Sequence, residues 1–120
     1  MKNKYTRILL ADINPDIRSA MALLLETRLA ARVVAEADSM ESLLAALSKS
    51  TPDIVIMDWE LPGTPVEDRV RLMRTSHPGI KVVVTSSRPE NAGLAKAMQA
   101  DTYVCKSDPP ERVIQVIKEL

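Results

Sequence analysis

The 120-residue sequence contains no phenylalanine, only three glycines and a single cysteine, Cys105. It therefore has neither the aromatic platform on which nucleic-acid bases stack nor a glycine-rich loop that cradles a nucleotide phosphate. One cysteine excludes an internal disulfide and a zinc site built from several cysteines. These absences argue against a nucleotide-binding enzyme and fit a reducing, cytoplasmic setting.

Net charge and long apolar runs are absent as well. Sixteen Lys and Arg residues balance sixteen Asp and Glu residues, which argues against binding of nucleic acid by this domain. No apolar run approaches the roughly 20 residues that a membrane span needs, and no apolar segment follows the charged N-terminus. We therefore expect a cytoplasmic globular domain with neither a membrane nor a nucleic acid as its partner.

What the sequence does contain is an alternation of two kinds of apolar segment. Five short runs, often β-branched, are typical of strands covered on both faces: 7–11, 32–35, 54–57, 81–84 and 102–105. Five helical patterns follow them, starting at or just after Asn14, Ser39, Val66, Glu90 and Pro110. This order predicts an α/β fold, a doubly wound parallel sheet with helices on both faces.

Polar side chains follow four of the predicted strands at their carboxyl ends, where ligands bind in open parallel sheets. Asp12 and Asp58 follow the first and third strands. Thr85 follows the fourth strand and Lys106 follows the fifth. Carboxylates bind Mg²⁺ and can attack a phosphoryl donor, whereas an ammonium and a hydroxyl can hydrogen-bond phosphoryl oxygens. The pattern therefore predicts a site that handles a phosphoryl group.

These residues and their surroundings resemble the receiver domain of bacterial two-component response regulators over essentially the whole chain. The matching segments are 8–15, 52–63, Thr85-Ser86 and 100–106. The resemblance implies a (βα)5 fold with five parallel strands in the order 2-1-3-4-5. It also implies a single receiver domain over residues 1–120, with no output domain in this chain, that acts in phosphorelay signalling and not as an enzyme.

By the same resemblance, Asp58 is the phospho-acceptor, Lys106 contacts the phosphoryl group, and Thr85 turns toward it on activation. Tyr103 is the aromatic residue that changes rotamer with the switch. The implied partners are a histidine kinase or phosphotransfer protein as donor and an effector domain or protein as target. The resemblance is also compatible with a weak homodimer. The segment 106–111 is similar to members that carry a helix-turn-helix output domain.

The resemblance further implies Mg²⁺, held by Asp12, Asp58 and the backbone carbonyl of Glu60. The family usually has two adjacent acids after the first strand, but here Ile13 stands at the second position. Isoleucine offers no oxygen to this hard cation, so we expect weak metal binding and slow or absent metal-dependent transfer. Asp12 and Asn14, the latter through its amide oxygen, are expected to compensate in part.

Two alternatives stay open. Ile13 also favours an atypical receiver that works as a phosphorylation-independent interaction or dimerisation module. The other is an unrelated flavodoxin-like enzyme or cofactor binder, against which the few glycines count. In the loop after Gly63, Pro65-Val66 replace an Asp-Gly pair common in the family. The arginines of the helix predicted at 66–74 are interpreted as a solvated face.

Overall fold

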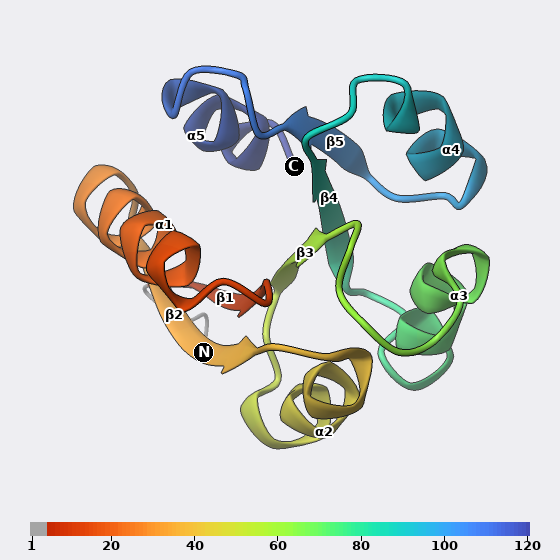
Figure 1. Cartoon of the computed structure of the whole chain (residues 1–120). Coiled ribbons are helices and arrows are strands. Elements are labelled where there is room, and N and C mark those ends of the chain that lie inside the picture. Colours follow the sequence, from red (N-terminus) through yellow and green to blue (C-terminus); the bar gives the residue numbers. More distant parts are fainter. Residues whose placement is uncertain (1–4) are drawn as a thin grey trace.

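The computed structural model of the protein describes residues 5–120, in which five strands alternate with five helices (Figure 1). The strands are β1 (Thr6–Ala11), β2 (Ala31–Ala37), β3 (Ile54–Asp58), β4 (Lys81–Ser86) and β5 (Thr102–Cys105). The helices are α1 (Pro15–Arg28), α2 (Met40–Ser50), α3 (Val66–Ser76), α4 (Asn91–Ala97) and α5 (Glu111–Lys118). The predicted α/β fold is confirmed.

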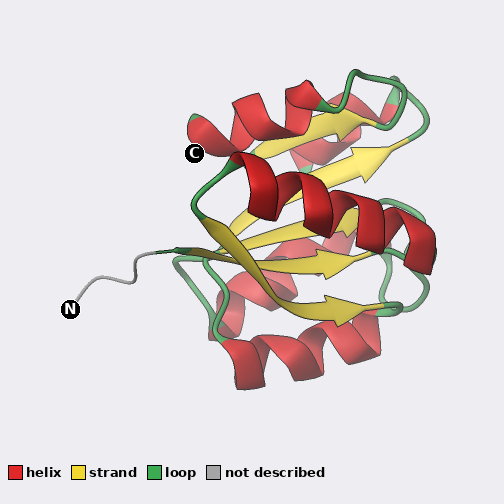
Figure 2. Ribbon diagram, turned by 90° about the vertical axis from the view of Figure 1, so that its left-hand side faces the viewer, coloured by secondary structure: helices red, strands yellow, loops and turns green. Residues whose placement is uncertain are grey.

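All five strands are parallel, and they lie in the order β2-β1-β3-β4-β5. Figure 2 shows their arrows pointing to one side, so the five carboxyl ends share one edge of the sheet. The predicted strand order is confirmed. Every loop that leaves a strand toward the next helix therefore opens at this same edge.

The sheet separates two hydrophobic cores. Helices α1 and α5 cover one face, and α2, α3 and α4 cover the other (Figure 1). Successive side chains of a strand point to opposite faces, so β3 sends Val55 into one core and Ile56 into the other. This two-sided burial explains why the strands are almost continuously apolar. Within residues 5–120, no helix is long and apolar enough to cross a bilayer.

Side-chain caps fix the starts of the first two helices. The side chain of Asn14 accepts hydrogen bonds from the N–H groups of Asp16 and Ile17, with Pro15 at the first helical position. Ser39 and Ser42 cap α2 reciprocally. Both caps agree with the sequence prediction. They also hold the loops after β1 and β2 in place at the carboxyl edge.

Candidate functional site

Two buried carboxylates lie side by side at the carboxyl edge of the sheet. Asp58 is the last residue of β3, and Asp12 directly follows β1. These strands pair with Ala11 opposite Met57, which puts the two aspartates at neighbouring positions one residue further on. Only 7% of Asp12 and 5% of Asp58 is exposed. Asp58 is thus a buried strand residue and not a solvated acid in a turn.

Lys106, directly after β5, joins the two carboxylates. Its Nζ lies 2.9 Å from Asp12 Oδ2 and 3.1 Å from Asp58 Oδ2. Burial alone would lower the pKa of Lys106, but the hydrogen bonds and charges of the two aspartates outweigh it, so the net pKa is raised. The first contact, with Asp58, is an ion pair at the carboxyl end of β3. The second contact, with Asp12, makes the ammonium a bridge between both acids.

The remaining carboxylate oxygens are held by the backbone. The N–H of Asn14 donates to Asp12 Oδ1 at 2.9 Å, and the N–H of Glu60 donates to Asp58 Oδ1 at 3.3 Å. Each acid therefore has one oxygen on Lys106 and the other on a peptide group two residues further along the chain. This arrangement orients both carboxylates without any further ligand.

Thr85 lies opposite Asp58 in the register of β3 and β4. It is buried, and it lines the same groove as Asp12 and Lys106. The apolar pattern predicts that the fourth strand ends before Thr85, whereas β4 extends through Ser86 in the structure. The backbone makes this extension possible, because the N–H of Trp59 donates to the carbonyl of Thr85 at 2.7 Å. The threonine is therefore held by the sheet beside Asp58.

Tyr103 lies on β5, away from the carboxylates. Its hydroxyl donates to the carbonyl of Arg88 at 2.6 Å, on the loop between β4 and α4. Burial raises the pKa of Tyr103, so the phenol stays neutral and able to donate. The structure thus places Tyr103 as a link between β5 and the loop after β4, and not at the acidic site itself.

The oxygen ligands available for a metal ion are few. Ile13 is 59% exposed and contributes no oxygen. The side-chain oxygen of Asn14 accepts two backbone hydrogen bonds that cap α1, and its part in metal binding stays a prediction. Among the described residues there is no group of three His, Cys, Asp or Glu side chains that could hold a metal. The two aspartates and a nearby backbone carbonyl are the remaining donors.

The arginines of α3 correct one expectation. Arg71 is exposed, as predicted, but Arg69 is buried and donates to three backbone carbonyls of the loop after Asp58. Arg74 pairs with Asp101 at 2.6 Å, which links α3 to the start of β5. The interpretation of the three arginines as one solvated face is therefore wrong, and Arg69 is a residue of the site that was not predicted from the sequence.

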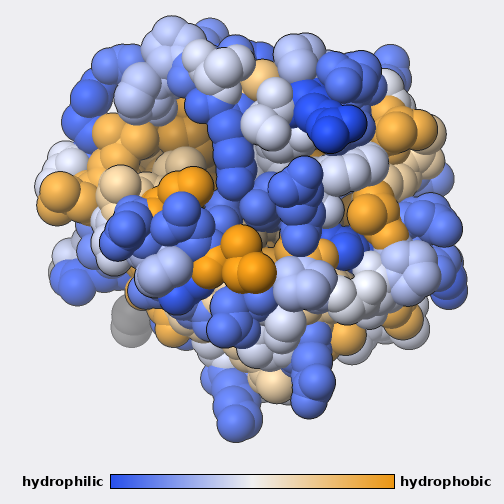
Figure 3. All heavy atoms as spheres, viewed as in Figure 1, coloured by the Kyte–Doolittle hydropathy of each residue, from blue (hydrophilic) through white to orange (hydrophobic). Residues whose placement is uncertain are grey.

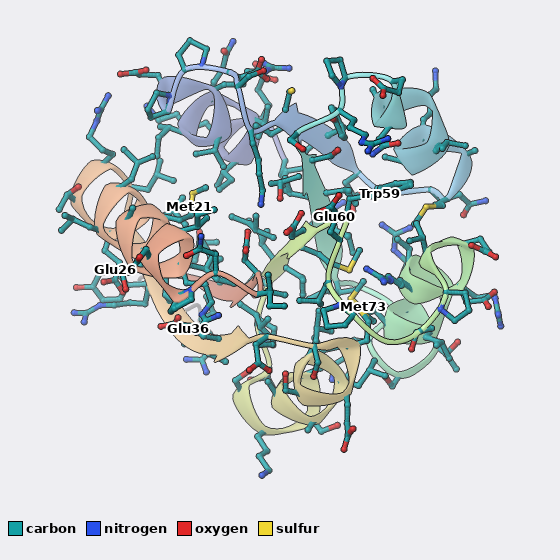
Figure 4. All side chains as sticks on the ribbon, in the orientation of Figure 1. Met21, Glu26, Glu36, Trp59, Glu60 and Met73 are labelled. Atoms are coloured by element: carbon teal, nitrogen blue, oxygen red, sulfur yellow. The ribbon has the colours of Figure 1, made fainter. Side chains whose placement is uncertain are left out.

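A groove of ≈ 450 Å³ runs between α1 and α5 and reaches Asp12, Thr85 and Lys106. Figure 3 shows apolar atoms gathered between these two helices, on the left of the view. In Figure 4, Met21 of α1 lies toward the same space, and it is one of the residues that line the groove. The acidic site is therefore open on this side and is not sealed in the core.

Comparison with known protein families identifies the family to which the chain belongs. A family model described as response regulator receiver domain matches residues 8–118. The chain belongs to the response regulator receiver domain family. This receiver is 29% identical over 116 residues to the response regulator GacA of Pseudomonas aeruginosa, covering 95% of the chain and 54% of that protein. It is 30% identical over 115 residues to the transcriptional activator protein ExaE of Pseudomonas putida, covering 94% and 54%.

Solved structures agree with this assignment. A LuxR-family two-component response regulator from Aurantimonas superposes with a TM-score of 0.87 at 31% identity, covering 96% of this receiver and 84% of that chain. The isolated receiver domain of RcsB from Salmonella enterica, with a beryllofluoride phosphomimetic, has a TM-score of 0.86 at 18% identity, covering 95% and 86%. The latter supports the fold alone. The receiver spans about half the length of its curated relatives and is a signalling domain of a two-component system.

Proposed function

We propose that this receiver accepts a phosphoryl group on Asp58 from a histidine kinase or a phosphotransfer protein. The observation that carries the proposal is the bridge of Lys106 between two buried carboxylates at the open edge of the sheet. A carboxylate oxygen of Asp58 attacks phosphorus, and the P–N bond to the donor histidine breaks as the new P–O bond forms. Lys106 then neutralises charge on the phosphoryl oxygens.

Receiver domains typically bind Mg²⁺ at their acidic site. The oxygen donors present here fit this ion, although they include one carboxylate fewer than is usual in the family. Asp12 and Asp58 would hold it together with the backbone carbonyl of Glu60, and waters would complete its shell. The bound ion would supply charge neutralisation for the transferring phosphoryl group. Because Ile13 supplies no oxygen and Lys106 already bridges both acids, the protein binds this ion weakly.

The same proposal assigns the switch to Thr85 and Tyr103. Thr85 lies beside Asp58 in the sheet, within reach of a group added to that carboxylate. Tyr103 changes rotamer only if its hydroxyl leaves the carbonyl of Arg88. The face formed by β4, α4, β5 and α5 would thereby change shape and bind an effector domain or protein. Phosphorylation biases an equilibrium between two arrangements that both exist beforehand.

The direct test is phosphoryl uptake from a small phosphodonor in the presence of Mg²⁺. We expect a mass increase of one phosphoryl group that is lost on treatment with hydroxylamine, as an acyl phosphate is. Asp58→Asn must abolish it, while Asp53→Asn, which changes an acid at the opposite end of the sheet, must leave it intact. No uptake by the unchanged protein would favour the phosphorylation-independent interaction module instead.

Restoring the missing acid gives a separate prediction. Ile13→Asp is expected to lower the dissociation constant for Mg²⁺ by about tenfold, because a third carboxylate joins a site that has two. Titration of the fluorescence of Trp59, the single tryptophan, measures the change. Ile13→Ala is the control, since it removes the apolar side chain without adding oxygen. Equal affinities in the two variants would contradict the placement of residue 13 at the metal site.

A further inference from the structure

Arg69 is the most deeply buried charged side chain of the described residues, with 4% of it exposed. Its guanidinium donates to the loop of residues 59–65, called here the acceptor loop. Nε lies 2.8 Å from the carbonyl oxygen of Thr64, Nη1 lies 3.2 Å from that of Trp59, and Nη2 donates to that of Leu61. Arg69, a residue of α3, thus holds the loop that follows Asp58 with all three nitrogens of its guanidinium.

A buried cation persists only where its donors and its charge are matched. Three carbonyl oxygens take the donors of Arg69, and the negative charges of Asp58 and Glu67 favour its charged form. Burial is the larger influence and lowers the pKa of Arg69, yet arginine stays protonated in proteins. The acidic site therefore contains two carboxylates and two cations, with Lys106 on one side of Asp58 and Arg69 behind the acceptor loop.

The acceptor loop is held from two directions. The carbonyl of Pro62 accepts a hydrogen bond of 2.8 Å from the N–H of Met40, at the start of α2. From the side of α3, Arg69 holds the carbonyl of Trp59, which belongs to the same peptide group as the N–H of Glu60, and the carbonyl of Leu61. Figure 4 shows Trp59 and Glu60 next to each other where the loop leaves β3. With both neighbours held, Glu60 has little freedom to turn.

This peptide lies at the centre of the site. The N–H of Glu60 donates to Asp58 Oδ1, and its carbonyl is the proposed backbone ligand for Mg²⁺. We propose that Arg69 is a positioning residue: by holding the carbonyls on either side of Glu60, it fixes the peptide that orients the Asp58 carboxylate for phosphoryl transfer. The positioning of the peptide is a property of the fold, whereas its consequence for transfer rests on the proposed function.

The shape of the side chain matters in this inference, and not only its charge. A guanidinium presents a planar fork that reaches three carbonyls at once, whereas the single ammonium of lysine cannot reproduce that geometry. Arg69→Lys keeps the positive charge and loses the fork. Arg69→Met keeps the length and loses both. The two variants therefore separate positioning from simple charge compensation.

The test compares these variants with Arg71→Met, a matched control on the same helix. Arg71 has 69% of its side chain exposed, and within residues 5–120 its guanidinium pairs only with Asp68. In chelator, we expect acrylamide quenching of Trp59 to rise about twofold in both Arg69 variants, because the acceptor loop opens more often. At saturating Mg²⁺, the rate of phosphoryl uptake is expected to fall about tenfold in both. Arg71→Met is expected to match the unchanged protein in both measurements.

Two outcomes would overturn the proposal. Full recovery of both measurements in Arg69→Lys would show that only the charge matters. Wild-type quenching and rate in a folded Arg69→Met would show that the loop needs no anchor. If Arg69→Met does not fold, Arg69→Lys alone decides, and unchanged quenching and rate would again refute it. If the unchanged protein takes up no phosphoryl group, the proposed function fails, while the quenching measured without metal still decides whether Arg69 holds the Glu60 peptide.

Discussion

Gly63→Ala is expected to lower the free energy of unfolding by about 3 kcal/mol, because it combines backbone strain with a steric clash. Gly63 has a φ of +119°, a region that residues with a side chain rarely adopt. A Cβ built there would lie 2.8 Å from the Cβ of Met40, closer than two such atoms approach each other. The acceptor loop must move away from α2 to relieve both problems, and the hydrogen bond from Met40 to Pro62 would weaken with it.

A second glycine provides the control. Gly93 lies inside α4, and a Cβ there would meet nothing within 4 Å. Gly93→Ala is expected to raise stability by about 0.5–1 kcal/mol, since alanine loses less backbone entropy in a helix. Urea unfolding followed by circular dichroism measures both variants. If Gly63→Ala proves as harmless as Gly93→Ala, the close approach of the acceptor loop to α2 is wrong.

Most of the fold could be predicted because its determinants are local. The almost continuous apolar runs indicate strands that are buried on both faces, and Asn14 and Ser39 have the side chains that cap helices. The ends of the strands were less certain. Asp58 and Thr85 belong to strands in the structure, whereas their polar side chains suggest positions just beyond. A strand end is decided by the hydrogen bonds of the neighbouring strand, which the segment's own residues do not reveal.

The acidic site was partly predictable for a geometric reason. In a parallel sheet, residues that follow adjacent strands must meet at one edge, so Asp12, Asp58 and Lys106 were expected near one another. The simultaneous contact of Lys106 with both acids depends on the path that its side chain takes across the end of β4. The sequence offered two roles for the Asn14 oxygen, helix cap and metal ligand, and the structure uses it as the cap.

Arg69 escaped prediction because arginine is rarely buried and its neighbours Glu67 and Asp68 are charged. One signal was present: Arg69 precedes Val70 and lies four residues before Met73, so it shares the apolar face of its helix. An arginine on such a face must find carbonyls or acids to satisfy it. The backbone carbonyls that satisfy it are 5 to 10 residues away in the sequence and come together only in the folded loop.

The electrostatics of the bridge lead to the second large effect. Lys106→Met is expected to cost about 2 kcal/mol of stability in chelator, because Asp12 and Asp58 lose the ammonium that neutralises both. The loss is smaller than for a fully buried pair, since 28% of the lysine side chain is exposed. The two facing carboxylates then attract a divalent cation with no competing ammonium. We therefore expect Mg²⁺ to bind about tenfold more tightly and to restore most of the lost stability.

Thermal unfolding with and without Mg²⁺ measures this linkage, and Lys81→Met is its control. Lys81 lies at the opposite end of β4, with 53% of its side chain exposed and a 4.0 Å contact with Asp101. Its replacement is expected to change stability by less than about 1 kcal/mol and to leave the response to Mg²⁺ unaltered. Lys106→Met could instead be as stable in chelator as the unchanged protein and show no added response to Mg²⁺. That result would show that the ammonium does not occupy the place of the cation. If the expected response is seen, Lys106 and Mg²⁺ compete for the same two carboxylates, and the missing acid at Ile13 leaves the lysine with the advantage.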